Sequence, residues 1–163
     1  KSSSARFKFI FIHNLVGGLD RNGRGGSEAA GLFEWGGHNP DGSKVFKERR
    51  PGWDTPIHSL LVQNKVSVVF HGHDHFYAKQ DLDGIVYQLV PQPGHTKLQE
   101  RAPRSASEYG YRDGLFLANS GHMCVSVTPT QATIDYIRSV LPGERTSGPQ
   151  NGEVVHSYTI KAN

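Results

Sequence analysis

The sequence predicts an α/β fold for a single domain portion spanning residues 1–163, and three observations lead to this fold class. Two segments rich in aromatic and β-branched residues, 7–13 and 66–70, are typical of strands. Between them, residues 55–64 have the start and stop signals of a helix. The second half of the chain has the pattern of short strands separated by turns, and its 36% of hydrophobic residues is enough for the core of one domain.

The first predicted element is the strand at residues 7–13, which we expect to be buried or nearly so, because its lone interior charge, Lys8, stands near its start. A glycine-rich region follows at residues 14–52. Loops of this length inside a compact domain are usually functional. We expect a short helix within it at residues 27–35, with Ser27 as its N-cap.

The next two elements complete a strand–helix–strand unit. Residues 55–64 predict a helix, with Thr55 as a plausible N-cap, Pro56 at the first helical position and Asn64 at its end. The strand at residues 66–70 follows directly. Because strands joined by a crossover helix pair in parallel, we expect this strand and the first one to be neighbours in one sheet.

The rest of the chain predicts β structure. The turn at residues 128–131 is typical of a hairpin, a further turn is predicted at residues 81–84, and residues 92–112 are polar and predict a surface loop. We expect the later strands to form a second sheet packed against the first. The five strands predicted here are residues 84–90, 114–119, 123–128, 132–138 and 154–160.

Composition narrows the classes of partner. The net charge of +3 is mildly positive and suits anionic substrates, but the basic residues are scattered and do not indicate nucleic-acid binding. No apolar run reaches the ~18 residues of a membrane helix. The single cysteine, Cys124, excludes a disulfide within the chain and a cysteine-rich zinc module. Its apolar surroundings at residues 123–127 predict a buried structural thiol.

A cluster of histidines directly follows the strand at residues 66–70. In an extended segment, His73 and His75 point to the same side, and the carboxyl ends of strands are the usual place for ligands in α/β sheets. Imidazole suits zinc and iron, and manganese less strongly. Gly72 lets the backbone approach the site, and His71 is expected to be an outer hydrogen-bonding group. The cluster reads His71-Gly72-His73-Asp74-His75.

A third candidate metal ligand is His13, at the end of the first predicted strand. Alone, a histidine in this position is usually structural. If the two strands are parallel neighbours, however, His13 points into the same cleft as His73 and His75. A single zinc held by these three histidines and a water is one arrangement of such ligands.

These segments together resemble a known family. Phe11-Ile12-His13 and Phe70-His71-Gly72-His73-Asp74-His75-Phe76 are similar to the last two signature motifs of calcineurin-like metallophosphoesterases, the group that includes the purple acid phosphatases. The resemblance implies the C-terminal half of a metallophosphoesterase-type β-sandwich with flanking helices. It also implies hydrolysis of phosphate esters by two divalent or trivalent metal ions (Zn, Mn or Fe), with His13 and His73 on one metal and His75 on the other.

The sequence departs from that family in its upstream motifs. Asp-x-His, Gly-Asp-x-x-Asp and Gly-Asn-His-Asp/Glu, which supply the remaining ligands in the family, do not occur here. The chain is therefore expected to need a missing N-terminal half or a companion chain, and to be inactive alone. The alternative is a catalytically silent β-rich domain that binds a metal or a partner. By resemblance, a secreted or periplasmic location is favoured.

Two residues of the glycine-rich region are candidates for binding the phosphate-ester substrate. Arg24, followed by two glycines, offers a guanidinium and backbone amides to a phosphate. His38 is a candidate for contact with the leaving group, and Trp35 is either a wall of the pocket or part of the core. No residue is assigned as catalytic, and monoesters, diesters, nucleotides and pyrophosphate all remain open as substrates.

Overall fold

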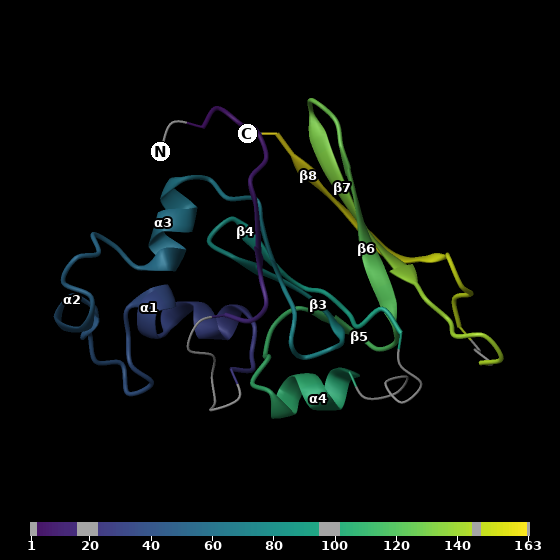
Figure 1. The fold of residues 1–163 in the computed structure, drawn as a ribbon, viewed down its shortest axis with the longest axis horizontal. Coiled ribbons are helices and arrows are strands. Elements are labelled where there is room, and N and C mark those ends of the chain that lie inside the picture. The colour runs from purple at the N-terminus through teal and green to yellow at the C-terminus, as the bar shows by residue number, and fades with distance from the viewer. Residues whose placement is uncertain (1–2, 16–22, 95–101, 145–147, 163) are drawn as a thin grey trace.

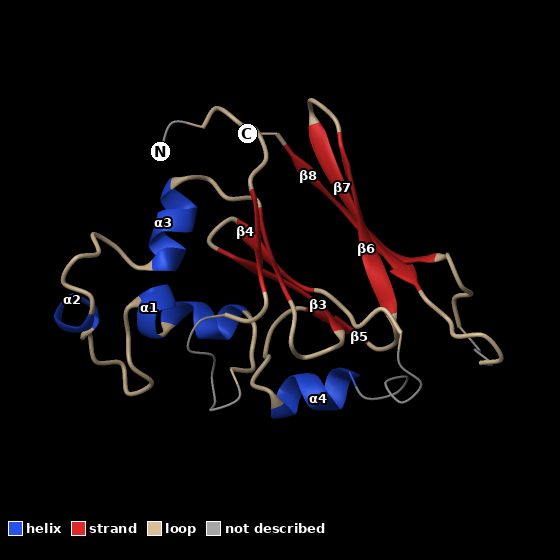
Figure 2. Ribbon diagram, viewed as in Figure 1, coloured by secondary structure: helices blue, strands red, loops and turns tan. Residues whose placement is uncertain are grey.

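The computed structural model describes residues 3–15, 23–94, 102–144 and 148–162, and these form two β-sheets and a few short helices (Figures 1 and 2). The first sheet has the strand order β1-β2-β4-β3-β5, and the second has the order β6-β7-β8. The mixed α/β class predicted from the sequence is therefore confirmed. The strands are β1 (Phe9–Ile12), β2 (Val68–His71), β3 (Tyr77–Leu82), β4 (Ile85–Leu89), β5 (Leu115–Leu117), β6 (Gly121–Val127), β7 (Gln131–Arg138) and β8 (Val154–Lys161).

Strands β1 and β2 are parallel neighbours, as the strand–helix–strand pattern predicted. Their register aligns Phe9 with Val68 and Ile12 with His71, so the carboxyl ends of both strands lie at the same level of the first sheet. Strand β4 lies parallel to β2 on its other side. The ends of β1 and β2 are therefore side by side, which brings together the residues that follow each strand.

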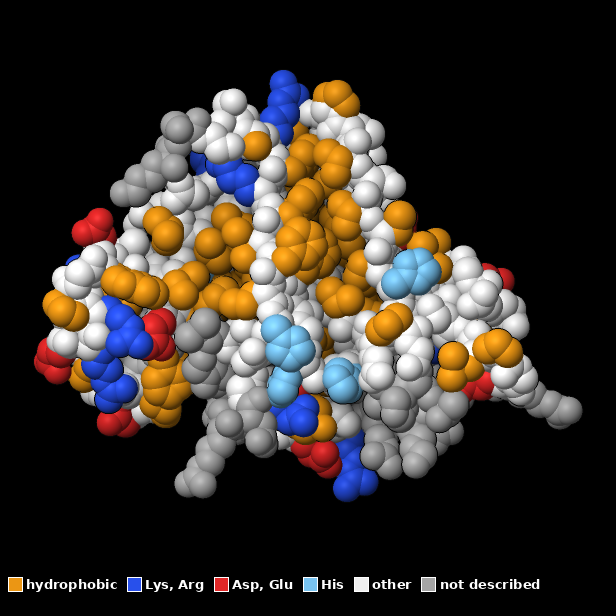
Figure 3. Space-filling view, viewed as in Figure 1, with side chains coloured by type: hydrophobic (Ala, Val, Ile, Leu, Met, Phe, Trp, Pro, Cys, Tyr) orange, Lys and Arg blue, Asp and Glu red, His pale blue; other side chains and the backbone are white. Residues whose placement is uncertain are grey.

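The expectation that the first strand is buried is wrong. Strand β1 is at the edge of its sheet, and Phe11 is 74% exposed. The Phe11 ring stacks on Phe70 of β2, with 5.1 Å between the ring centroids, and otherwise faces outward. In Figure 3, hydrophobic side chains gather in a continuous area between β1 and the second sheet. In the described chain, this edge has no further strand beside it.

The hairpin of β3 and β4 was only partly predicted. The sequence indicated the turn and the second strand, but β3 itself was missed. The turn residues Asp83 and Gly84 have φ angles of 50° and 78°, the left-handed conformation that favours a two-residue hairpin turn. Strand β3 lies between β4 and β5, and its Gln80 is 1% exposed. The expectation that all later strands form the second sheet is therefore wrong for β4 and β5, which belong to the first sheet because β4 pairs with β2 and β5 pairs with β3.

The second sheet is built from the three last strands. The turn at residues 128–131 is confirmed, because the N–H of Thr128 donates to the Gln131 carbonyl over 2.8 Å between β6 and β7. One hydrophobic cluster contains residues of both sheets, with Val68 and Phe70 from β2 and Ala132 and Ile134 from β7. This contact packs the second sheet on the face of the first.

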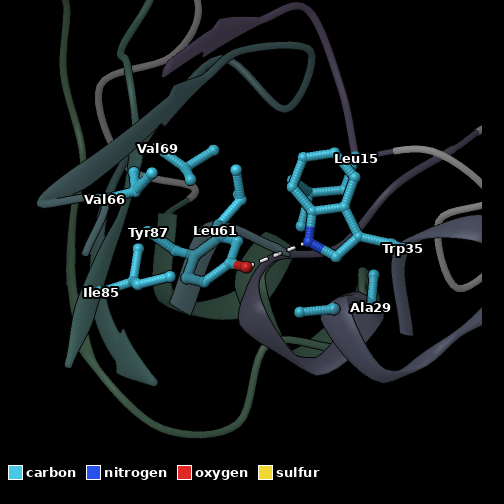
Figure 4. Close-up of a cluster of buried hydrophobic side chains, with 9 residues drawn as sticks. Leu15, Ala29, Trp35, Leu61, Val66, Val69, Ile85 and Tyr87 are labelled. Carbon is cyan, nitrogen blue, oxygen red and sulfur yellow. Dashed lines mark hydrogen bonds between the residues drawn. The ribbon is translucent and has the colours of Figure 1, made fainter. Parts of the chain in front are cut away.

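The helices cover the opposite face of the first sheet (Figure 1). Trp35, 1% exposed, belongs to the core there and not to a pocket wall. Its Nε1–H donates to the Tyr87 hydroxyl over 3.0 Å (Figure 4). Nδ1 of His58 also forms a hydrogen bond with the Tyr87 hydroxyl, over 2.7 Å. Burial raises the pKa of Tyr87 to about 12. The Tyr87 hydroxyl therefore stays protonated at neutral pH and links two layers of the core.

The helices differ from the prediction at their ends. They are η1 (Ser27–Gly31, a 3-10 helix), α1 (Phe33–Gly36), α2 (Phe46–Arg49), α3 (Ile57–Gln63) and α4 (Ala102–Glu108). The predicted helix at residues 27–35 is thus two pieces divided by the extended Leu32, with Gly26 and not Ser27 as the first cap. Pro56 caps α3 instead of starting it, Thr55 is not its cap, and Asn64 ends it as predicted.

Two further expectations are wrong. Helix α4 lies inside the segment predicted as a surface loop, where Arg104 and Glu108 form an ion pair one turn apart. Cys124 is exposed, because β6 is an edge strand and its apolar residues are not covered on both faces, as the 54% exposure of Val127 shows. Among the described residues, no helix has the length and apolar character needed to cross a membrane.

Candidate metal centre

The structure brings His13 and His73 together at the ends of β1 and β2. His13 follows β1 directly, and His73 lies two residues after β2. Nε2 of His13 is 3.2 Å from Nδ1 of His73, and the two rings meet edge to face at 83°. At this distance one facing nitrogen can donate a hydrogen bond to the other, and the tautomers of the two rings decide which one donates.

Gly72 allows the two strand ends to approach this closely. Its N–H donates to the His13 carbonyl over 2.7 Å, which continues the β1–β2 pairing into the site. A Cβ atom at Gly72 would lie 3.3 Å from the same carbonyl oxygen, tighter than an ordinary contact. The close backbone approach expected from the sequence is therefore present.

The spacing of the two facing nitrogens matches that of two ligands of one metal, which would replace the hydrogen bond between them. Two nitrogens bound tetrahedrally at 2.0–2.1 Å from one zinc are about 3.3 Å apart, close to the observed 3.2 Å. Nε2 of His73, the ring nitrogen that does not face His13, is buried and has no hydrogen-bond partner among the described residues. A buried polar atom of this kind is usually satisfied by a water or an ion.

The predicted grouping of His75 with this pair stays a prediction. His75 is exposed, has a φ of 67°, and accepts a hydrogen bond at its carbonyl from the N–H of Gln92 over 3.3 Å. Within the described parts of the chain, no three His, Cys, Asp or Glu side chains are grouped closely enough to hold one ion.

His71 is the most deeply buried histidine of the cluster, with 2% exposure. Burial lowers the pKa of its imidazole to about 4, so the ring is neutral at physiological pH. Its carbonyl accepts the Val90 N–H over 2.7 Å, while its Nε2 is buried and has no hydrogen-bond partner in the part of the chain that the structure describes. The expected outer hydrogen bond from His71 stays a prediction.

Asp74 is the residue of the site that the sequence analysis did not single out. Its side chain is 2% exposed. Oδ1 accepts from Nη1 of Arg24 (2.7 Å), and Oδ2 accepts from the Gly25 N–H (3.2 Å) and the Tyr111 hydroxyl (2.9 Å). Burial, followed by the Asp74 charge, raises the pKa of Tyr111, so its hydroxyl remains a donor. One carboxylate thus joins three segments that are distant in sequence.

Arg24 is tied into this arrangement. Besides its ion pair with Asp74, its guanidinium lies over the Tyr109 ring, 4.0 Å from the centroid. The side chain is 28% exposed, so part of it faces solvent. Its predicted contact with a phosphate stays a prediction, and its observed contacts make it part of the support for the histidine loop.

The glycine-rich segment next to Arg24 is docked on the first sheet. Gln80 of β3 accepts the Ser27 N–H at Oε1 (2.9 Å) and donates from Nε2 to both Glu28 oxygens (2.9 and 3.0 Å) and to the Asp113 carbonyl (2.7 Å). A Cβ atom at Gly26 would lie 1.9 Å from Gln80 Oε1 and 2.5 Å from Tyr111. A side chain at this position would therefore displace Gln80 or Tyr111 where the segment packs on the sheet.

His38 lies elsewhere. It is half-buried, and its Nδ1 is 3.2 Å from the Gly31 carbonyl. It lines a hollow beside α1 and α2 whose lining residues are all different from those of the hollow at His13. Its predicted contact with a leaving group stays a prediction, and the structure does not place it in the hollow at the histidine pair.

An open hollow of about 370 Å³ is lined by His13 of the pair and by His71. It has an aromatic wall and a histidine rim, and it lies along the exposed apolar area that Figure 3 shows. Its lining residues are Phe11, Ile12, His13, Phe70, His71, Gly72 and Val90. The arrangement offers imidazole nitrogens at one end of an apolar surface.

No protein-family model matches this sequence, and no curated protein is significantly similar to it. The fold and the site geometry are therefore the grounds for a functional proposal.

Proposed function

We propose that this chain is the C-terminal portion of a calcineurin-like metallophosphoesterase, whose parent enzyme hydrolyses phosphate esters. The observation that carries the proposal is the pair of histidines, 3.2 Å apart, at the adjacent carboxyl ends of two parallel strands. The two sheets, packed through residues of β2 and β7, are proposed to be half of the family's β-sandwich.

In this proposal the chain supplies imidazole ligands. His13 and His73 hold one ion, and His75 holds the second. Two zinc, manganese or iron ions, when bound, supply Lewis acid chemistry and an activated water for attack on phosphorus. Arg24 contacts the phosphate with the exposed part of its side chain, and His38 contacts the leaving group. Neutral imidazoles are required, so protons compete with the ion and binding weakens at acidic pH.

The remaining ligands are proposed to come from a missing N-terminal half or a companion chain. The edge position of β1 supports this, because an edge strand presents backbone groups to an incoming strand. The 74% exposure of Phe11 provides an apolar contact for the same partner. For the assembled enzyme we propose a secreted or periplasmic location, which follows from the family resemblance alone.

A second candidate is a catalytically silent domain that binds a partner. It is favoured by apolar side chains that stay exposed on both sheets, such as Phe11 (74%) and Val154 (55%). The two candidates differ in metal uptake at the histidine pair, which the first requires and simple partner binding does not.

The deciding experiment is calorimetric titration of the chain with zinc and with manganese, for the parent and for His73→Ala. We expect weak binding by the parent, because the carboxylate ligands are absent, and its loss in His73→Ala. His122→Ala is the matched control, since His122 is exposed on β6. Equal uptake by the parent and His73→Ala, or no uptake by the parent, would contradict the proposal.

A further inference from the structure

We propose that Asp74 is a positioning residue that fixes the loop at residues 71–76 and so sets the direction of the His73 ring. The part of this inference that concerns metal binding rests on the function proposed above. Three donors from two other segments converge on the Asp74 carboxylate: Arg24 and Gly25 from the glycine-rich segment, and Tyr111 from the segment after α4.

The loop needs such support because its backbone is strained on both sides of Asp74. The φ angles of His73 and His75 are 84° and 67°, in the left-handed region that residues with a side chain rarely adopt. Conformations of this kind persist only where the surroundings determine them. Asp74 lies between the two histidines, and its carboxylate accepts three hydrogen bonds.

Burial makes the hydrogen bonds of the Asp74 carboxylate costly to break. The Asp74 side chain is 2% exposed, and a buried carboxylate is tolerated when its oxygens accept hydrogen bonds. Movement of the loop would separate the carboxylate from its donors and leave it unsatisfied. The loop geometry that brings Nδ1 of His73 to 3.2 Å from His13 is therefore coupled to a network on its other side.

The hydrogen bonds of Asp74 give Arg24 a structural role in addition to the contact with phosphate proposed above. Its Nη1 lies 2.7 Å from Asp74, and its guanidinium lies over the Tyr109 ring at 4.0 Å. Arg24 acts on the histidines through Asp74, so it is a positioning residue in this inference. The glycine-rich segment thereby becomes the support of the metal ligands.

The first arm of the test uses the metal-free chain and the variants Asp74→Asn and Tyr111→Phe. Tyr111→Phe removes one hydroxyl and keeps the ring, so it serves as a second, milder variant if Asp74→Asn folds poorly. We expect amide hydrogen exchange at residues 72–75 to be about tenfold faster or more in Asp74→Asn and to rise less in Tyr111→Phe. Asp113→Asn, at an exposed carboxylate nearby, is the control and leaves exchange unchanged.

A spectroscopic signature separates positioning from a general loss of structure. The imidazole NMR signals of His13 and His73 should shift in both variants at fixed pH, while those of His58 and His156 stay in place. Shifts of all four histidines together, or exchange rates in both variants equal to the parent's, would overturn the inference.

The second arm is zinc calorimetry on the same proteins. We expect the affinity of Asp74→Asn to fall about 10- to 100-fold, the range typical for residues that orient metal ligands. Failure of the parent to bind zinc would overturn the proposed function, while the exchange and NMR results would still decide whether Asp74 holds the loop. Zinc binding by both variants with the parent's affinity would overturn the positioning role in metal binding.

Discussion

The hydroxyl of Tyr77 lies 2.7 Å from Nδ1 of His156, and this hydrogen bond joins the first sheet to the second. Burial raises the pKa of Tyr77, so its hydroxyl stays protonated and donates to a neutral His156. The Tyr77 ring also stacks on Tyr136 of β7, with 4.8 Å between centroids. A polar contact and a stacked pair thus hold the sheets together at one place.

This contact predicts a pH dependence of stability. Burial, and then the charge of Lys79, lower the pKa of His156 below 6.5, so the unfolded chain binds a proton before the folded chain does. The contribution of His156 to stability is present above pH ~6.5 and is lost as the pH falls through the pKa of the folded state. Urea unfolding between pH 7.5 and 5.0 should show a smaller loss in His156→Gln, which keeps an acceptor and does not titrate. Equal losses in the parent and His156→Gln would contradict this assignment.

A second prediction concerns Gly26, where the glycine-rich segment crosses β3. Gly26→Ala places a Cβ 1.9 Å from Gln80 Oε1 and 2.5 Å from the Tyr111 ring, so one of them must move. We expect a loss of about 1–3 kcal/mol in the free energy of unfolding, measured by denaturant titration. Gly31→Ala is the control, because a Cβ there meets no atom of the described residues within 4 Å beyond its chain neighbours and its own helix backbone. A loss in Gly31→Ala as large as that in Gly26→Ala would show that sterics are not the cause.

A third prediction concerns the helical side of the core. Trp35→Phe removes the N–H that donates to Tyr87 and leaves a void in a fully packed cluster. We expect it to reduce the free energy of unfolding by about 1–3 kcal/mol. Trp53→Phe, at a residue that is 44% exposed, should change it by less than about 0.5 kcal/mol. Thermal unfolding of both variants provides the comparison, and similar melting temperatures would count against this account of the core.

A fourth prediction addresses the exposed edge of the first sheet. Phe11→Asp places a charge on the apolar area and removes the ring that stacks on Phe70. We expect weaker self-association in sedimentation velocity and less binding of a hydrophobic dye, because exposed apolar patches drive both. Trp53→Asp serves as the control at another exposed aromatic residue. If Phe11→Asp and the parent behave alike in both measurements, the apolar area does not mediate association.

The pairing of β1 with β2 was accessible from the sequence because it depends on local patterns: two aromatic or β-branched runs and a helix between them. Strand β3 was missed because Lys79, Gln80 and Asp81 are polar. Gln80 is buried only because Glu28 and Asp113, 52 and 33 positions away, satisfy its amide. Such a strand depends on partners that no window along the chain contains.

The same distinction between local sequence patterns and partners distant in sequence applies to the site. His13 and His73 could be selected because each ends or follows a recognisable strand, and the structure places them in contact. The role of Asp74 was hidden, because its partners Arg24 and Tyr111 are 50 and 37 positions away. Its place between two histidines was the one local signal, and it does not reveal whether the carboxylate faces inward.

The position of His13 at the end of an edge strand has a thermodynamic consequence for the proposed assembly. If a second polypeptide pairs with β1 and adds carboxylates to the ion held by His13 and His73, association and ion binding are linked. The bound ion then raises the affinity of the two polypeptides for each other by the same factor by which their pairing raises the affinity for the ion, as reciprocity between two binding equilibria requires. The concentration of free ion would set the fraction of complete enzyme, and removal of the ion would favour separation of the two halves.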